Sequence, residues 1–198
     1  MLSSRRFSVP IRNTAHRYGI IAQLVHWLVV ALLAAQFPLG MTASSLPISP
    51  TRLALLAWHK SIGFLILGVI ILRLGWRLYS PPPPLPATVP VLQQYAARVS
   101  HGLMYVILLA MPLVGWASSS AANLTVSVFG WFVLPNLTAP DKELAQWLIS
   151  THVVMAWLLL SIIVLHVTAA LWHHFVIRDD VLKRMLPLFT RTHEDSSP

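Results

Sequence analysis

Histidine is the residue of this sequence with the greatest capacity for chemistry. The 198-residue chain contains nine histidines, only six acidic residues and no cysteine. The lack of cysteine excludes disulfides, iron–sulfur clusters, thiolate-bound zinc and the covalent attachment of c-type haem. Imidazole nitrogen suits transition metals, whereas carboxylates prefer magnesium, calcium and manganese. Any metal chemistry must therefore rest on histidine, and iron or copper bound by nitrogen is favoured.

Two pairs of residues share a spacing of fourteen positions. His166 follows His152 by fourteen residues, and Arg73 follows His59 by the same number. Fourteen residues are two heptads, so a gently supercoiled helix presents both members of a pair on one face. At 1.5 Å per residue, the members lie roughly 20 Å apart along the helix axis.

Four hydrophobic segments must position these residues. Apolar side chains make up 56% of the chain and charged ones 10%, and the mean hydropathy is +0.68. A helix crosses a bilayer with roughly 20 apolar residues. The sequence predicts an all-α fold, an integral membrane up-and-down four-helix bundle in residues 19–175, between a basic arm (1–18) and a tail (176–198). The expected spans are residues 19–41, 53–79, 95–118 and 144–175.

The basic residues predict the orientation of the bundle. Eleven of the fourteen Lys and Arg residues lie in the amino-terminal arm, beside the proline-rich connection after the second span, or in the tail. The other two connections hold Arg52, Lys60 and Lys142. By the positive-inside rule, both termini are cytoplasmic. The net charge of +8 does not predict a nucleic-acid partner, because the charges form short blocks between spans rather than one basic face.

With this orientation, four histidines fall into two layers. His26 and His166 lie at similar depths near the cytoplasmic side, and His59 and His152 lie near the outer ends of their spans. Ionisable groups in membrane helices are costly and almost always face the bundle interior. Helix bundles commonly bind cofactors between facing helices, and two axial histidines on one iron suit electron transfer. The layers therefore predict two b-type haems, with these four histidines as the iron ligands.

Arg73 supports the cytoplasmic haem site independently. It falls at the depth of His26 and His166, where a buried guanidinium needs an anionic partner. A haem propionate would supply one through a charge-assisted contact. Arg52 or Lys60 could play the same part for the outer haem, although both could equally extend to the surface.

The other five histidines leave alternatives open. Once the two pairs are formed, His101 has no obvious depth-matched mate left, so a structural role or a quinone contact is as compatible with its position as ligation is. His173 and His174, near the cytoplasmic interface, could anchor the surface or provide a proton route to a quinone. His16 and His193 are expected to be solvated. No residue is singled out as catalytic.

The order and spacing of these motifs resemble the prokaryotic cytochrome b561 family, the bacterial four-helix di-haem cytochromes b. The resemblance covers nearly the whole hydrophobic chain. Its motifs are Arg17-Tyr18, His26-Trp27-Leu28, His59, Arg73-Leu74, the proline run from Pro81, Ser100-His101, the series His152, His166, His173-His174, and the tail Arg178-Asp179-Asp180-Val181-Leu182 with Arg184-Met185-Leu186-Pro187. The resemblance implies a multi-pass protein of the bacterial inner membrane that exchanges electrons with ubiquinone. It also implies haem ligation by His26 with His166 and by His59 with His152.

Three functions compete on these observations. The first is an electron carrier that crosses the membrane through two haems and exchanges electrons with a quinone. Its donor would be a redox partner protein or superoxide, which the resemblance implies for some members of the family. The second is a haem-bearing membrane anchor subunit of a dehydrogenase or hydrogenase. The third is a transporter, which the lack of Asp and Glu within the four predicted spans disfavours.

Overall fold

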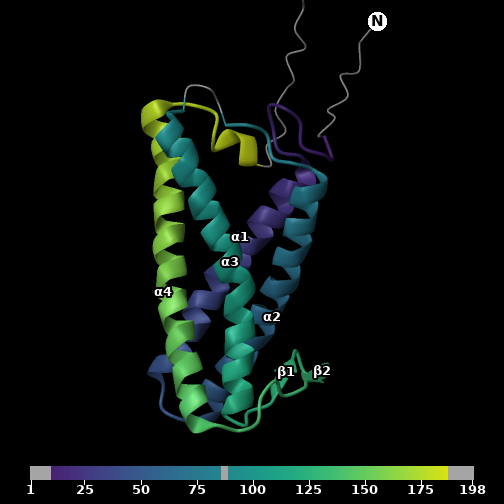
Figure 1. Ribbon diagram of the computed structural model, residues 1–198, viewed down its shortest axis with the longest axis vertical. Helices are drawn as coiled ribbons and strands as arrows, with labels where there is room; N and C mark the ends of the chain where they lie inside the picture. The colour runs from purple at the N-terminus through teal and green to yellow at the C-terminus, as the bar shows by residue number, and fades with distance from the viewer. Residues whose placement is uncertain (1–9, 86–88, 187–198) are drawn as a thin grey trace, which may run out of the picture.

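The computed structural model describes residues 10–85 and 89–186 (Figure 1). Four long helices make up most of it: α1 (Ile20–Ser45), α2 (Pro50–Tyr79), α3 (Val91–Ala121) and α4 (Lys142–Trp172). A π-helical turn, η1 (His173–Ile177), continues α4, and a short 3-10 helix, η2 (Lys183–Met185), follows. All four long helices are long and apolar enough to span a bilayer. The predicted all-α membrane bundle is therefore confirmed.

The helices extend beyond the apolar segments that predicted them, and local capping explains where two of them begin. The Ser49 side chain accepts a hydrogen bond from the backbone of Arg52, and Pro50 occupies the first turn of α2. The Asp141 carboxylate accepts two backbone N–H groups at the start of α4. Hydropathy reports the depth of a segment in the membrane, whereas these caps decide where the hydrogen-bonded helix begins.

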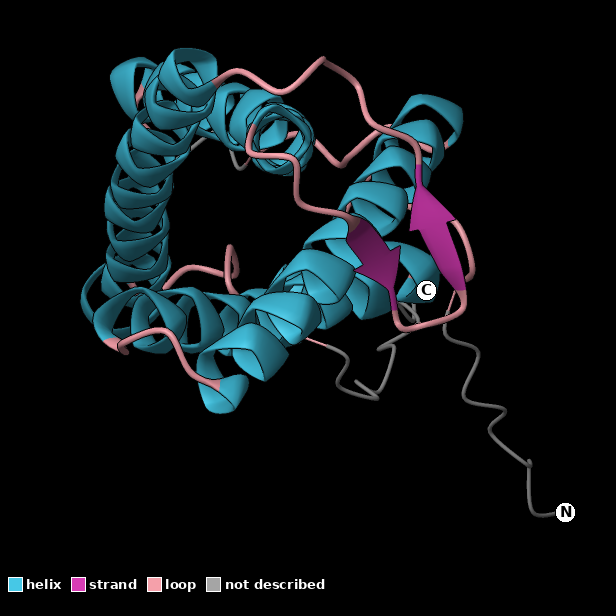
Figure 2. Ribbon diagram, turned by 90° about the horizontal axis from the view of Figure 1, so that it is seen from below, coloured by secondary structure: helices cyan, strands magenta, loops and turns pink. Residues whose placement is uncertain are grey.

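The four helices pack as two neighbouring pairs. α1 packs mainly on α2, α3 packs mainly on α4, and the two pairs meet chiefly through α2 and α3. Seen from one end, the helices surround a common central axis (Figure 2). The chain thus runs up and down through the bundle, and each helix can direct side chains toward that axis.

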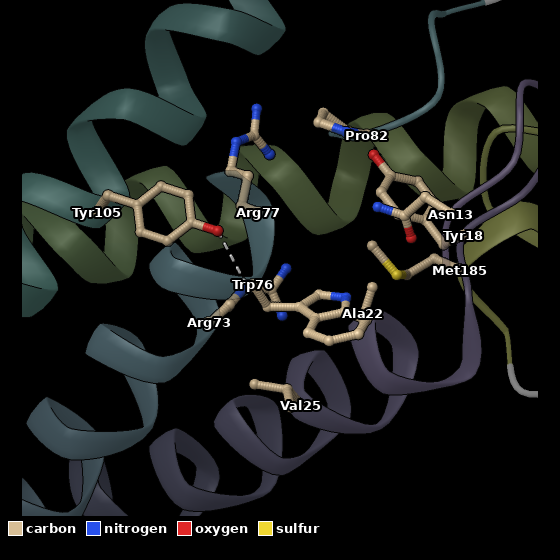
Figure 3. A pocket seen from close by; sticks show the side chains of 10 residues that line it. All are labelled: Asn13, Tyr18, Ala22, Val25, Arg73, Trp76, Arg77, Pro82, Tyr105 and Met185. Atoms are coloured by element: carbon tan, nitrogen blue, oxygen red, sulfur yellow. Dashed lines mark hydrogen bonds between the residues drawn. The ribbon is translucent and has the colours of Figure 1, made fainter. Parts of the chain in front are cut away.

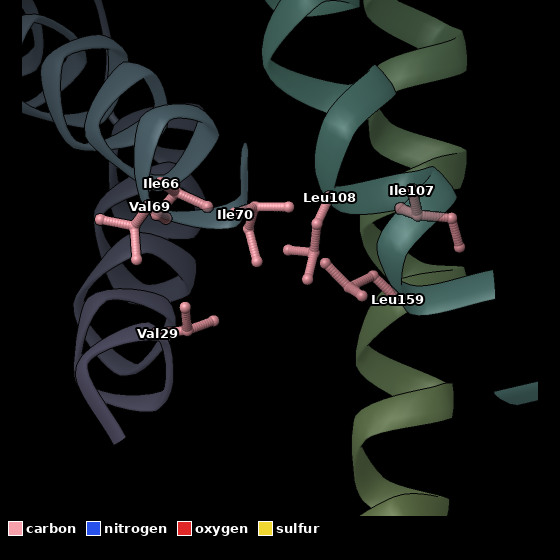
Figure 4. Close-up of a cluster of buried hydrophobic side chains, with 7 residues drawn as sticks. All are labelled: Val29, Ile66, Val69, Ile70, Ile107, Leu108 and Leu159. Atoms are coloured by element: carbon pink, nitrogen blue, oxygen red, sulfur yellow. The ribbon is translucent and has the colours of Figure 1, made fainter. Parts of the chain in front are cut away.

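A buried apolar core occupies the middle of the bundle, with contributions from every helix (Figure 4). Its members are Val29, Ile66, Val69, Ile70, Ile107, Leu108 and Leu159. Leu159, only 1% exposed, lies seven residues from both His152 and His166, while Ile66, 3% exposed, lies seven residues from His59. The heptad spacing therefore puts these histidines on the interior faces of their helices, on either side of the core.

A β-hairpin lies against α2 and α3 near one end of the bundle, in the connection between the third and fourth predicted spans. Strand β1 (Val126–Val128) pairs antiparallel with β2 (Phe132–Leu134), and the turn has positive φ angles at Phe129 and Gly130. The Ser61 hydroxyl of α2 accepts a hydrogen bond from the Phe129 backbone at 2.9 Å. This contact fixes the hairpin to α2.

The described part of the tail packs at the opposite end of the bundle (Figure 1). The Gln23 side chain of α1 donates to the carbonyl of Arg184 at 3.1 Å, and the Trp27 indole donates to the carbonyl of Met185 at 3.0 Å. The Arg184 guanidinium donates to the carbonyl of Pro84, which lies in the proline-rich connection. The positive-inside rule predicts that this end is cytoplasmic. Residues 1–9 of the predicted arm and residues 187–198 of the tail, with His193, lie outside the described residues.

Candidate functional site

Two histidine pairs face each other across the bundle at different levels. His59 of α2 and His152 of α4 form the hairpin-end pair, with ring centroids 6.1 Å apart and ring planes at 73°. His26 of α1 and His166 of α4 form the tail-end pair, with centroids 6.5 Å apart and planes at 72°. The structure thus brings together both pairs that the depth argument matched.

The separations fit two axial imidazoles on one metal ion. With bonds of about 2.0 Å from metal to nitrogen, two opposed imidazole rings have centroids about 6.3 Å apart. The described residues contain no group of three or more His, Cys, Asp or Glu side chains that could hold a metal ion. A metal bound by either pair would need its remaining ligands from outside the described residues, and the four nitrogens of a porphyrin would meet that need.

His101 joins the tail-end layer, where the sequence found no mate for it. Its ring centroid lies 5.2 Å from that of His166, at an interplanar angle of 66°. This separation is about 1 Å shorter than the spacing of opposed axial imidazoles. His26 therefore matches His166 better than His101 does. The sequence could not reveal the contact, because it depends on how α3 is rotated and tilted against α4.

A cavity of about 400 Å³ surrounds the hairpin-end pair. Its lining comes from all four helices and is mostly apolar, with His59 and His152 among the few polar groups. Arg52 and Lys60 also line it. The volume lies within the range of roughly 300–1,000 Å³ for ligand and cofactor sites. The hairpin-end pair therefore has space beside it for a large, flat cofactor.

Backbone carbonyls hold both rings of the hairpin-end pair. Nδ1 of His59 lies 3.3 Å from the carbonyl oxygen of Gln36, and Nδ1 of His152 lies 3.2 Å from that of Met111. Because a carbonyl can only accept, each Nδ1 must carry the proton, and each Nε2 keeps its lone pair. The Gln36 amide nitrogen, 3.4 Å from Nε2 of His59, agrees with this tautomer. Metal-bound histidines usually have such a partner on the other ring nitrogen.

A positively charged pocket lies beside the tail-end pair (Figure 3). Arg73 donates through Nε to the Tyr105 hydroxyl at 3.1 Å and lies close enough to His26 and His166 to act on both rings electrostatically. Its Nη1 atom and the Trp76 indole nitrogen are buried, with no hydrogen-bond partner in the described part of the chain. No acidic residue lines this small pocket. The positive charge of Arg73 and the two buried donors, Arg73 Nη1 and the Trp76 indole nitrogen, therefore suit an anion or another hydrogen-bond acceptor.

Tyr18 faces the same pocket from the segment just before α1. Burial raises the pKa of its phenol, although the nearby Arg77 and Arg73 act to lower it. The phenol therefore stays protonated and uncharged at neutral pH, so it does not neutralise the two arginines.

The remaining histidines lie apart from the two pairs. His173 begins the π-helical turn, and its Nδ1 lies 2.5 Å from an Asp179 carboxylate oxygen. Nδ1 of His174 is buried and has no hydrogen-bond partner within residues 10–85 and 89–186. His16 is exposed, as predicted. Surface anchoring and a proton route both remain compatible with His173 and His174.

Comparison with known proteins supports one family. The family model described as prokaryotic cytochrome b561 matches residues 17–188. The chain is 37% identical over 182 residues to cytochrome b561 homolog 2 of Escherichia coli (strain K12), covering 88% of this chain and 93% of that protein. It is 29% identical over 172 residues to the probable superoxide oxidase CybB of Yersinia pestis, covering 86% and 96% of the two chains. Cytochrome b561 homolog 1 of Escherichia coli (strain K12) is also 29% identical, over 174 residues. The four apolar helices, the opposed histidines and these matches agree: the chain belongs to the prokaryotic cytochrome b561 family, whose members are b-type cytochromes of the membrane that take part in electron transfer.

Proposed function

We propose that this protein carries electrons across the bacterial inner membrane through two b-type haems. One haem would be held by His26 and His166, and the other by His59 and His152. The observation that carries the proposal is the separation of the two ring pairs, 6.5 and 6.1 Å, because both values lie close to the spacing of axial imidazoles. A haem assay on the purified protein tests it, with two b-type haems expected per chain.

Each part of the bundle contributes to this function in a different way. A bound haem supplies one-electron redox chemistry at each level. The Gln36 and Met111 carbonyls orient the rings of the hairpin-end pair, while the seven-residue core fills the space between the levels. Apolar interiors of this kind stay dry. The core therefore excludes water and ions from the path, so that charge crosses as electrons alone.

Arg73 is proposed to bind a propionate of the tail-end haem, since its Nη1 atom is buried without a protein partner in the described structure. We expect Arg73→Gln to weaken binding of that haem by about 10- to 100-fold, the equivalent of roughly 1.5–3 kcal/mol. The midpoint potential of the same haem should fall, because a nearby positive charge favours the reduced iron. Haem titration of the variant protein and a potentiometric titration measure the two effects.

Two further substitutions make the Arg73 experiment specific. Arg73→Lys keeps the charge but loses the fork geometry, so it should restore the potential better than the affinity. Arg98→Gln, at an exposed position on α3, should leave both haems unchanged. Unchanged affinity and potential in Arg73→Gln would show that another group holds the propionates.

Ubiquinone is proposed as the electron acceptor and superoxide as a donor. The similarity to a protein named as a probable superoxide oxidase supports the donor, and so do Arg52 and Lys60 at the cavity of the hairpin-end pair. A positive field raises the encounter rate of small anions. Two superoxide anions would deliver two electrons, which with two protons convert the quinone to the quinol and release two molecules of dioxygen.

Stopped-flow mixing of superoxide with the oxidised protein in quinone-containing vesicles tests this assignment. We expect rapid haem reduction followed by quinol formation, with a rate that falls as salt screens the charges. The double variant Arg52→Gln, Lys60→Gln should react roughly 10-fold more slowly, within the range attributed to electrostatic steering. No haem reduction by superoxide, together with co-purification of a dehydrogenase or hydrogenase subunit, would instead support a membrane anchor.

A further inference from the structure

The His59 ring packs against a part of the α1 surface that carries no side chain. Its Nδ1 donates to the carbonyl of Gln36, and its ring lies against Gly40, four residues further along the same helix. A Cβ atom added at Gly40 would lie 2.8 Å from Cε1 of His59 and 3.1 Å from Nδ1. Such a contact is too short to persist, so the ring would have to move.

His152 rests on α3 in the same arrangement. Its Nδ1 donates to the carbonyl of Met111, and its ring lies against Gly115, again four residues after the carbonyl. A Cβ atom at Gly115 would lie 3.2 Å from Cε1 of His152 and 3.3 Å from Nδ1. The contact is tighter than usual, and a small displacement of the ring would relieve it.

Helix geometry explains why glycine stands at these two positions. Side chains on a helix lean toward its amino terminus, so a residue at position i+4 covers the surface near residue i. The carbonyl at position i already accepts the helical hydrogen bond from residue i+4, but its second lone pair remains available. A glycine at i+4 leaves that lone pair open to a side chain from another helix.

We propose that Gly40 and Gly115 are positioning residues for the hairpin-end haem, an inference that rests on the proposed function. Each glycine lets an imidazole approach a backbone carbonyl, which fixes the tautomer and directs Nε2 toward the iron. Donation from Nδ1 also makes the imidazole a stronger base, which favours ferric over ferrous iron. The two glycines therefore set both the affinity for this haem and its reduction potential.

The proposed positioning of histidines by glycines applies to the hairpin-end haem alone. Neither His26 nor His166 has a backbone carbonyl partner for its ring in the part of the chain that the structure describes. Three other glycines within the helices, Gly68, Gly75 and Gly102, have no atom within 4 Å of an added Cβ. Alanine at those positions should be tolerated, and one of them provides a matched control.

Haem content and midpoint potentials of the purified Gly40→Ala, Gly115→Ala and Gly68→Ala proteins test the inference. We expect Gly40→Ala to lower the affinity for the hairpin-end haem by about 10- to 100-fold, as is usual when a partner of a metal-bound histidine is lost. Any hairpin-end haem that remains should have a higher midpoint potential and an altered low-spin EPR signal. Gly115→Ala should retain both haems, with a smaller rise of the same potential. Gly68→Ala should match the wild-type protein.

Two results would overturn the inference while leaving the proposed function intact. One is a pair of alanine variants at residues 40 and 115 that keep two haems at wild-type potentials. The other is loss of both haems from Gly115→Ala but not from Gly68→Ala, because the defect would then lie in the fold rather than in one site. A wild-type protein that binds no haem would overturn the proposed function itself.

Discussion

Replacing His152 by alanine is expected to leave the protein with one haem in place of two. His152 supplies one of the two imidazoles of the hairpin-end pair, and no third His, Cys, Asp or Glu side chain in the described residues completes a metal site there. The haem absorbance per chain should therefore fall by half, and electron transfer from an external donor to quinone should fall to background. A pyridine haemochrome assay and a reduced-minus-oxidised spectrum measure the loss.

Three further variants make the His152 experiment specific. His59→Ala should remove the same haem as His152→Ala, so the double variant should lose no more than either single change. His166→Ala should remove the other haem and leave the spectrum of the first. His16→Ala, at an exposed position, should keep both. Retention of two haems in His152→Ala would refute the assignment of the hairpin-end site.

The second large effect concerns the tail-end layer, where three imidazoles lie close together. We expect His26→Ala to lose the tail-end haem and His101→Ala to retain it. The reason is geometric, since the centroids of His26 and His166 are 6.5 Å apart, whereas those of His101 and His166 are only 5.2 Å apart. Haem counts and low-spin EPR spectra of the two variants decide between the pairings.

The opposite result would reassign the ligand. If His101→Ala lost a haem and His26→Ala kept both, the axial pair would be His101 with His166, and α3 rather than α1 would hold the iron. Loss of the haem in both variants, with wild-type helicity by circular dichroism, would show that haem binding at this site also requires the His101 side chain. Only the first of these findings, reassignment of the ligand, would contradict a purely structural role for His101.

Much of the architecture could be predicted because the membrane restricts what the chain can do. A bilayer requires about 20 apolar residues per helix, so hydropathy alone located four spans. Helices rise by a constant amount per residue, so the position of each histidine within its span predicted its depth. The fourteen-residue spacings predicted a shared face, and the nearly complete burial of Leu159 between His152 and His166 agrees with it.

Other features depended on side-chain contacts that no one-dimensional pattern contains. The contact of His101 with His166 depends on the rotation and tilt of α3, which its hydropathy does not specify. The hairpin over residues 126–134 is held by a hydroxyl of α2 from a distant part of the sequence. The described part of the tail packs on α1 through the backbone carbonyls of Arg184 and Met185.

By itself, the sequence determined the number of helices and the relative depths of His26, His59, His152 and His166, and it restricted any metal chemistry to histidine. Only the tertiary structure decided how each imidazole is held. The partners of His59 and His152 are main-chain carbonyls, and every residue has one, so residue types cannot mark them. These two carbonyls differ from the others because Gly40 and Gly115 carry no side chain to cover them. The missing side chain matters only because a histidine of another helix packs there, and only the tertiary structure shows that contact.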